Sequence, residues 1–154
     1  MQSTVSLTRA LALLLVGLYA GGVLFVVLAP STGRLPGSAY VRHWQALNTD
    51  YARVMPPLLL TSVLALTVTA VLSWHRDWWT FTLGVGALVL VVLTIVLTVA
   101  EMEPLNRIAD SWDPEHLPPN WPQVRQRWAH LHLVRTGLAV TAFACLIVAQ
   151  VRDR

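Results

Sequence analysis

The fold is decided by residues 79–100, which read WTFTLGVGALVLVVLTIVLTVA and contain no charged side chain. A transmembrane helix needs about 20 consecutive apolar residues to cross roughly 30 Å of hydrocarbon. Three further stretches meet this requirement, at residues 7–29, 55–74 and 128–151. The sequence therefore predicts an all-α integral membrane protein, a single domain in which four antiparallel transmembrane helices form a bundle.

The composition supports lipid as the solvent of this chain. Of its 154 residues, 55% are hydrophobic and only 12% are charged, whereas soluble domains carry roughly 25% charged residues. The net charge of +3 comes from 11 arginines, with no lysine, against 8 acidic residues. These arginines are scattered rather than clustered, which excludes nucleic acid as a partner. Membrane lipid and a hydrophobic small molecule are the expected partners, and the oligomeric state is open.

The first apolar stretch has a second interpretation, as a cleaved signal peptide. Its apolar part is longer than the roughly 7–15 residues typical of such peptides. It also contains Gly17 and Gly21, which form a small-residue packing motif of membrane helices. We therefore expect a retained helix, with both glycines at close approach to another helix. The single cysteine, Cys145, lies in an apolar run and cannot form an internal disulfide.

The connections between the spans differ in length. Residues 75–78 are the only link between the second and third spans, so these two must form an antiparallel pair. The first long connection, residues 30–54, becomes helical and amphipathic from Tyr40 onwards. Pro56 and Pro57 remove two backbone donors, so the chain should kink or restart there. We therefore expect an amphipathic helix in the first long loop, which either kinks or restarts as it passes into the second span.

The second long connection, residues 101–127, contains five prolines. Pro104 is expected to end the third span, because a proline in a helix interior removes a hydrogen bond. Pro122 suits a first helical turn, so the fourth helix should begin there, above the membrane. From Pro122 to Val151 such a helix is about 45 Å long, which exceeds the hydrocarbon core.

Four spans place both termini on one side of the membrane and both long connections on the other. A count of all arginines favours the long connections as the cytoplasmic side. Arg9, however, flanks the first helix, and the first helix usually dominates the orientation. We therefore expect a bacterial inner (plasma) membrane protein with both termini in the cytoplasm.

The fourth span carries the residues that indicate a functional site. At about 100° per residue, Arg125, Trp128, His132 and Arg135 fall on one helical face, whereas His130 lies on the far side. Arg135 lies about one turn inside the apolar region, where an unpaired charge costs roughly 2.5–3.5 kcal/mol or more. It should therefore face the bundle interior and find partners there. The alternative is that Arg135 extends to the interface and His132 makes only a packing contact.

Partners should come from the two long connections, which lie at the same end of the bundle. Glu101 ends the third span and is the expected counter-ion of Arg135, with an ordinary interfacial carboxylate as the alternative. The first connection offers five such residues: His43, Trp44, Asn48, Asp50 and Tyr51.

A metal site is a further alternative. Four residues with suitable ligand atoms could converge on iron, zinc or copper: His43, His132, Glu101 and Glu103. No single helix carries a metal-ligand spacing such as H-x-x-x-H or E-x-x-H. No metal ligand and no cofactor are therefore assigned, and a metal or haem site stays an alternative.

Three short motifs along the chain belong together. The first is Arg127-Trp128 followed by His132-Leu-Val-Arg135-Thr136. The second is Pro104-Leu-Asn106-Arg107-Ile108 with Trp112 and then Pro118-Pro119-Asn120-Trp121. The third runs from His43-Trp-Gln-Ala-Leu-Asn48 through Met55-Pro56. This pattern resembles the anthrone oxygenase family of small four-helix membrane proteins. The acidic pair Glu101 and Glu103 departs from it, which leaves the substrate open.

The resemblance implies oxidation of a phenolic anthrone to an anthraquinone by dioxygen, without a cofactor. On this interpretation, His132 removes an acidic C–H proton, Arg135 stabilises the resulting enolate, and Asn106 orients polar substituents. The expected substrate-binding residues are Trp128, Trp112, Trp44, His43, Asn48, Arg107 and Glu101. Two alternatives remain: a non-catalytic bundle that binds a lipid, a quinone or a partner protein, and a metal- or haem-binding oxidoreductase.

Overall fold

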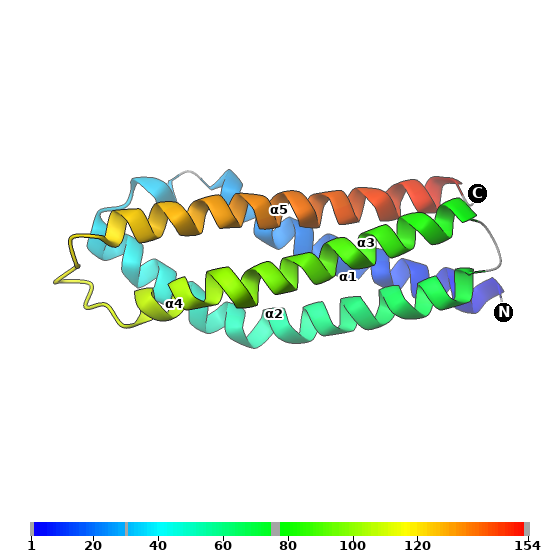
Figure 1. The fold of residues 1–154 in the computed structure, drawn as a ribbon, viewed down its shortest axis with the longest axis horizontal. Coiled ribbons are helices and arrows are strands. Elements are labelled where there is room, and N and C mark those ends of the chain that lie inside the picture. The colour runs from blue at the N-terminus through cyan, green and yellow to red at the C-terminus, as the bar shows by residue number, and fades with distance from the viewer. Residues whose placement is uncertain (1, 30, 75–77, 153–154) are drawn as a thin grey trace.

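The computed structural model describes residues 2–29, 31–74 and 78–152, with side chains from Val5 onwards. It contains the helices α1 (Gln2–Leu28), α2 (Gly37–Ser73), α3 (Trp78–Leu97), α4 (Glu103–Asp110) and α5 (Trp121–Arg152). Two short segments complete it: the 3-10 turn η1 (Thr32–Arg34) and the π-helical turn η2 (Thr98–Met102). Figure 1 shows one elongated bundle with both chain ends at the same end. The predicted all-α architecture is confirmed.

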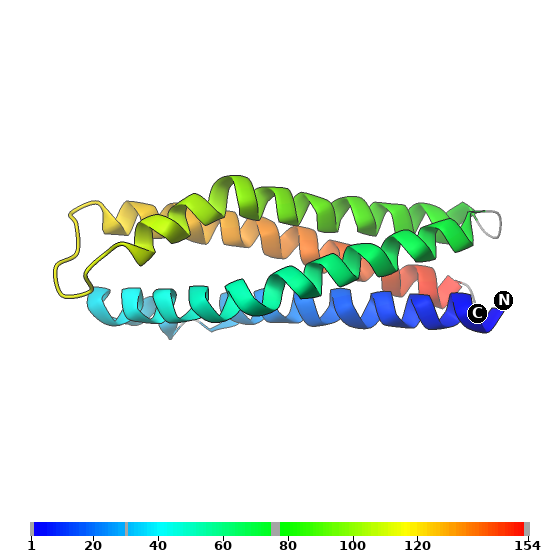
Figure 2. The same cartoon turned by 90° about the horizontal axis from the view of Figure 1, so that it is seen from below.

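The four long helices form an up-and-down bundle. Helix α1 packs against α2 and α5, and α3 packs against the same two helices. Each long helix is thus antiparallel to both of its neighbours, as Figures 1 and 2 show. Four helical segments, one for each predicted span, are long and apolar enough to cross a membrane. The predicted four-helix membrane bundle is confirmed, while the residues at which each helix enters the bilayer stay a prediction.

The bundle carries its large apolar side chains outside and small ones inside. Exposed fractions reach 71% at Leu7, 72% at Phe25 and 67% at Leu60. The fully buried side chains include five alanines: Ala12, Ala87, Ala109, Ala139 and Ala142. In lipid, helices associate through close packing of small residues, because burial of apolar surface gives little advantage there. This distribution fits a protein whose solvent is lipid.

Both glycines of α1 were expected to face another helix at close backbone approach; only Gly17 faces one, and there it meets a side chain rather than backbone. A Cβ atom at Gly17 would lie 2.8 Å from Cε2 of Phe143 on α5, so Gly17 does sit at a tight helix contact. A Cβ atom at Gly21 would meet nothing within 4 Å in the described part of the chain, and Gly21 is exposed. The prediction for Gly21 is therefore wrong. Its side of α1 is not covered by another helix.

Helix α2 is longer than the sequence suggested. The amphipathic segment that begins at Tyr40 is helical, as predicted, and it is continuous with the second span, because α2 runs from Gly37 to Ser73 and includes Pro56 and Pro57. Figure 2 shows α2 changing direction where its colour passes from cyan to green. A membrane helix tolerates prolines where neighbouring elements compensate for the lost hydrogen bonds. The chain therefore bends at these prolines and does not restart.

Pro104 does not end the third span. Helix α3 continues through the π-helical turn η2 into α4, which ends only at Asp110. Pro104 lies in the first turn of α4, where the missing backbone N–H has no required partner. Figure 2 shows the ribbon bulging outward between α3 and α4. A π-helical turn inserts an extra residue into the helix, and such turns are frequent at functional sites.

Helix α5 begins at Trp121, so the predicted helical start at Pro122 is confirmed to within one residue. Its 32 residues give a length of about 48 Å, which carries its first turns beyond a hydrocarbon core of about 30 Å. At the other end of the bundle, Trp74, Trp78 and Trp79 are exposed, as expected of an interfacial tryptophan belt. Residues 75–77 of the predicted short link lie outside the described residues.

Candidate functional site

An aromatic cluster closes the end of the bundle opposite the termini. We call it the loop-end cluster: Tyr40, Val41, Trp44 and Ala109 are its buried members, and Trp112, Leu117, Trp121, Val124 and Trp128 pack against them. The ring centroid of Trp44 lies 5.4 Å from that of Trp128 and 6.1 Å from that of Trp112. The three tryptophans predicted to bind substrate therefore lie together.

Asn106 ties this cluster together. Its Oδ1 accepts hydrogen bonds from Nε1 of Trp128 at 2.9 Å and from Nε1 of Trp44 at 3.2 Å. The Gln45 side chain donates to the backbone carbonyls of Ala109 and Trp112, both at 3.0 Å. Because these bonds join α2, α4 and α5, the amide of Asn106 organises the aromatic residues rather than pointing freely into space.

His132 lies one turn below Trp128 on α5 and is 3% exposed. The two rings are stacked, with centroids 4.9 Å apart and an interplanar angle of 3°. Nδ1 of His132 accepts a hydrogen bond from Nη2 of Arg135 at 2.7 Å, and Nε2 lies 3.0 Å from the carbonyl oxygen of Val23 on α1. A guanidinium only donates and a carbonyl only accepts. These partners therefore assign a neutral imidazole with its proton on Nε2.

Arg135 is a largely buried cation near the middle of α5. Among the residues that the structure describes, no carboxylate forms an ion pair with it. Its Nε–H is buried and has no hydrogen-bond partner within that same part of the chain. The phenols of Tyr19 and Tyr51 are close enough to interact with it electrostatically. Neutral groups and aromatic rings thus take the place of a counter-ion.

The predicted pairing of Glu101 with Arg135 is wrong. Oε2 of Glu101 instead accepts a hydrogen bond from Nη2 of Arg127 at 2.8 Å, and both side chains are exposed. Glu101 lies in η2, and one extra residue in a helix rotates the side chains around it by about 100°. The carboxylate therefore lies on the outer surface of the bundle.

The remaining predicted site residues do not reach His132 or Arg135. His43 is exposed and lies outside the loop-end cluster. Asn48 donates to the carboxylate of Asp110 at 3.2 Å, and Nε of Arg107 donates to Oε1 of Glu103 at 3.1 Å. The structure thus joins Asn106, Trp128, His132 and Arg135 in one chain of contacts.

Arg125 closes the first long connection onto α5. Its Nη2 donates to the carbonyl oxygen of Gly33 at 2.6 Å, and its guanidinium lies 4.2 Å from the ring centroid of Tyr40. A second link joins Arg42 of α2 to Glu115 in the loop before α5. Both long connections are therefore fixed to the helices that carry the site.

Sequence reasoning missed the contribution of α1. Tyr19 is 2% exposed, faces the bundle interior and has a buried hydroxyl without a hydrogen-bond partner in the described part of the chain. A phenol in an apolar span is a usable signal, since a buried Tyr hydroxyl normally finds a partner. The carbonyl of Val23, by contrast, carries no sequence signal.

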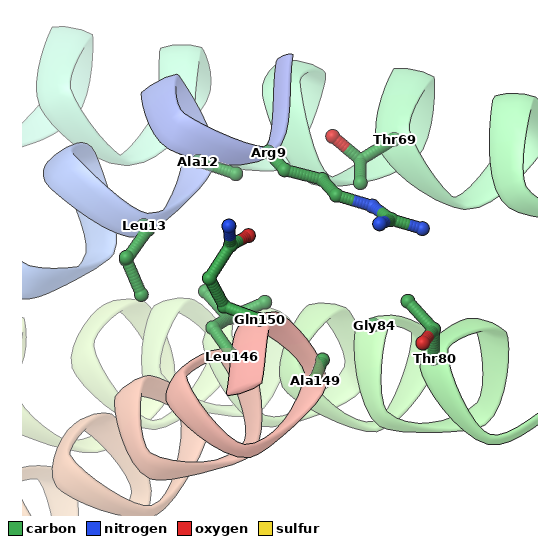
Figure 3. Close-up of a pocket in the computed structure, with 9 residues that line it drawn as sticks. All are labelled: Arg9, Ala12, Leu13, Thr69, Thr80, Gly84, Leu146, Ala149 and Gln150. Carbon is green, nitrogen blue, oxygen red and sulfur yellow. The ribbon is translucent and has the colours of Figure 1, made fainter. Parts of the chain in front are cut away.

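A small cavity of about 20 Å³ lies at the other end of the bundle, near the termini. Figure 3 shows its lining, which includes Arg9, Thr69, Thr80 and Gln150. The volume is enough for about one water molecule. Nη2 of Arg9 donates to Oγ of Ser73 at 3.2 Å at this end of the bundle. This cavity is separate from the predicted site.

The donor set does not favour a metal. Nowhere in residues 2–29, 31–74 and 78–152 do three His, Cys, Asp or Glu side chains come close enough together to hold a metal ion. Among the four potential ligands that the sequence offers, His132 is buried inside the bundle, whereas His43 and Glu101 are exposed.

Comparison with known families decides the assignment. The family model described as "Anthrone oxygenase" matches residues 43–145, which include the loop-end cluster, His132 and Arg135. The chain belongs to the anthrone oxygenase family. Membership supports an oxygenase-like function in general terms. No curated protein and no solved structure matches the chain. Tyr19 and Val23 of α1 lie outside the matched range, so their part in the site rests on this structure.

Proposed function

We propose that this membrane-embedded member of the anthrone oxygenase family oxidises a hydrophobic phenolic or anthrone-type substrate with dioxygen. The observation that carries the proposal is Arg135. A buried cation without a carboxylate partner in the described chain is costly in a membrane. A substrate that develops negative charge would supply the missing partner. The stacked rings of Trp128 and His132, to which Arg135 is hydrogen-bonded, suit a flat ring system.

The chemistry follows from the acidity of the substrate. The CH2 group of an anthrone, which lies across the central ring from the carbonyl, loses a proton to a base, and the electron pair is delocalised through the rings onto the carbonyl oxygen as an enolate. The enolate carbon transfers electrons to dioxygen and forms a C–O bond. The resulting peroxide takes up the proton that the base had removed. Loss of the second C–H proton with cleavage of the O–O bond gives a quinone carbonyl and water. One dioxygen suffices, and no cofactor is required.

The contact between His132 and Arg135 suggests how the base is released. In the structure, the lone pair of His132 Nδ1 is occupied by Nη2 of Arg135 at 2.7 Å. A substrate oxygen that becomes the new acceptor for Arg135 would free Nδ1 to remove a proton. The bond from Nε2 to the Val23 carbonyl keeps the ring oriented meanwhile. The enolate would then form beside the cation that stabilises it.

Oxygen uptake by the purified protein in detergent, with a panel of anthrone-like phenols, tests this proposal. His132→Ala should lower turnover by about 10²–10⁴-fold, the usual contribution of a general base. Arg135→Lys should also be poorly tolerated, because a point charge does not reproduce a planar fork. His130→Ala is the matched control, because His130 is exposed on the opposite face of the same helix and should be dispensable.

Two results would contradict the proposal in different ways. Full activity in His132→Ala would remove the base assignment. No oxygen uptake by the wild type across the panel would favour the non-catalytic alternative, a bundle that binds a lipid, a quinone or a protein. The bonding of both ring nitrogens of His132 is the observation that favours this alternative, since it also suits a purely structural role.

We further propose that the protein lies in a bacterial inner membrane with both termini in the cytoplasm. Arg9 flanks the first span at that end, and the first helix usually sets the orientation. Three loop-end arginines are paired with glutamates, so they serve the loop structure. We expect fluorescence from a reporter fused to the C-terminus when that reporter is of a kind that fluoresces only in the cytoplasm. Activity of a periplasmic reporter at the same position would reverse the orientation.

A further inference from the structure

Near His132, two buried hydrogen-bond donors lack an acceptor in the described part of the chain. They are the hydroxyl of Tyr19 on α1 and the Nε–H of Arg135 on α5. Thr94 on α3 is the polar neighbour of Tyr19 and is close enough to influence its hydroxyl, but the two side chains do not form a well-aligned hydrogen bond. The Thr94 hydroxyl instead donates to the carbonyl of Val91 at 2.7 Å. We call these two groups the unpaired donors.

The unpaired donors lie at the same level of the bundle. The bond between His132 Nε2 and the Val23 carbonyl fixes the register of α5 against α1. From His132 to Arg135 the chain advances three residues, or about 4.5 Å, towards the termini. From Val23 back to Tyr19 it moves four residues, or about 6 Å, in the same direction, because the two helices are antiparallel. The Tyr19 phenol and the Arg135 guanidinium also interact electrostatically.

Leaving both donors unpaired is unfavourable for the protein alone. A buried donor without an acceptor pays the cost of losing its water, and such groups are rare in folded proteins. One acceptor that carries negative charge would satisfy both donors and neutralise the guanidinium. Pre-organised donors aimed at a developing oxyanion are the arrangement that stabilises enolates in enzymes. A flat aromatic ligand would pack against neighbouring aromatic and apolar side chains.

We propose that the Tyr19 hydroxyl and the Arg135 Nε–H together bind the anionic oxygen of a phenolate or enolate ligand. As an assignment in catalysis this rests on the proposed function, in which that oxygen belongs to the substrate enolate. Tyr19 keeps its proton and acts only as a hydrogen-bond donor. Nη2 of the guanidinium, which bonds to Nδ1 of His132 in the free protein, can turn to the same oxygen and so free Nδ1 as the base.

Tyr19→Phe removes one of the two donors and changes nothing else in the packing. If the hydroxyl is unpaired in the free protein, Tyr19→Phe should unfold at a temperature no lower than the wild type. Turnover should nevertheless fall by about 10²–10³-fold, the effect of removing one oxyanion donor. A lower unfolding temperature would show that the hydroxyl is paired within the fold, which overturns the proposal.

Thr69→Val is the matched control, because Thr69 also has a buried hydroxyl without a partner in the described chain. It lines the small cavity at the opposite end of the bundle (Figure 3). This variant should keep the oxygen uptake of the wild type. Equal losses in Thr69→Val and Tyr19→Phe would mean that removal of any interior hydroxyl disturbs the protein, and the specific role of Tyr19 would be lost.

Alizarin binding gives a readout that does not depend on turnover. Alizarin is a hydroxylated anthraquinone whose visible spectrum changes when its phenol ionises. The wild type should bind the anion and lower the apparent pKa of the dye, and Tyr19→Phe should lose most of this shift. If the wild type shows the shift without any oxygen uptake, the anion site stands and the oxygenase proposal fails. If Tyr19→Phe matches the wild type in spectrum and turnover, the anion site is refuted.

Discussion

Replacement of Asn106 by Leu is the clearest perturbation of the loop-end cluster. Leucine has a similar volume but no acceptor, so two indole N–H groups lose their common partner at 2.9 and 3.2 Å. Trp44 is 4% exposed and cannot turn to water, whereas Trp128 is only partly buried. Most of the loss in stability should therefore come from the unpaired N–H of Trp44.

The expected magnitude follows from the burial of these donors. A buried donor left without an acceptor costs about 1–3 kcal/mol. Partial access of water to Trp128 lowers the upper limit, so we expect a total of about 2–4 kcal/mol. For a chain of this size this corresponds to a fall in Tm of roughly 4–16 °C. Asn106→Asp should show a smaller fall in Tm, because a carboxylate oxygen can still accept both hydrogen bonds.

Thermal unfolding in detergent, followed by tryptophan fluorescence, measures this effect. Asn48→Leu is the matched control, because its bond to Asp110 is exposed and its loss should change stability by about 0.5 kcal/mol or less. Trp128→Phe should lower the free energy of unfolding less in the Asn106→Leu variant than in the wild type, since the Trp128 N–H is already unpaired in that variant. The reasoning is refuted if Asn106→Leu is as stable as the wild type, or if it is more stable than Asn106→Asp.

Two further predictions concern packing and pH. Gly17→Leu should destabilise the bundle by about 1–3 kcal/mol in thermal unfolding, because its Cβ would lie 2.8 Å from Phe143, whereas Gly21→Leu should have no effect. Equal effects would contradict the tight contact at Gly17. Hydrogen bonding to Asp113 raises the pKa of His116 above its ordinary 6.5, and the same bond lowers the pKa of Asp113 below 3.8. The small stabilisation from this exposed pair is lost as pH rises through the raised His116 pKa or falls through the lowered Asp113 pKa. In an NMR titration, Asp113→Asn should bring the His116 midpoint back towards 6.5, and an unchanged midpoint would exclude the pairing.

Much of the architecture could be predicted because its cause is local. Apolar runs of bilayer length define the four spans, and the spacing of His132 and Arg135 places them on one face of α5. The burial of Arg135 followed from the cost of a charge in lipid.

The errors have a common physical cause, which is the behaviour of long membrane helices. Pro104 was expected to end the third span, and a restart of the helix was one of the two outcomes expected at Pro56 and Pro57, but a helix in lipid retains its hydrogen bonds wherever it can. The π-helical turn that accommodates Pro104 also turned Glu101 towards Arg127.

The contribution of Tyr19 was not predictable, because the register between α1 and α5 depends on side-chain packing. Hydrophobic periodicity shows which face of a helix is buried, but it does not show which residues of two helices meet. The contact between His132 and the Val23 carbonyl, which sets this register, involves a backbone atom that any residue would provide.

Isotope-labelled dioxygen tests the central claim most directly. The purified protein, in detergent or in lipid nanodiscs, is incubated with an anthrone under the labelled gas, and the quinone is analysed by mass spectrometry. The account predicts that label enters the new carbonyl faster than in a sample of heat-denatured protein, and that His132→Ala removes this difference while His130→Ala keeps it. Incorporation of label at the same rate with denatured protein would contradict the assignment of this bundle as an oxygenase. A new carbonyl oxygen that comes from water would contradict it as well.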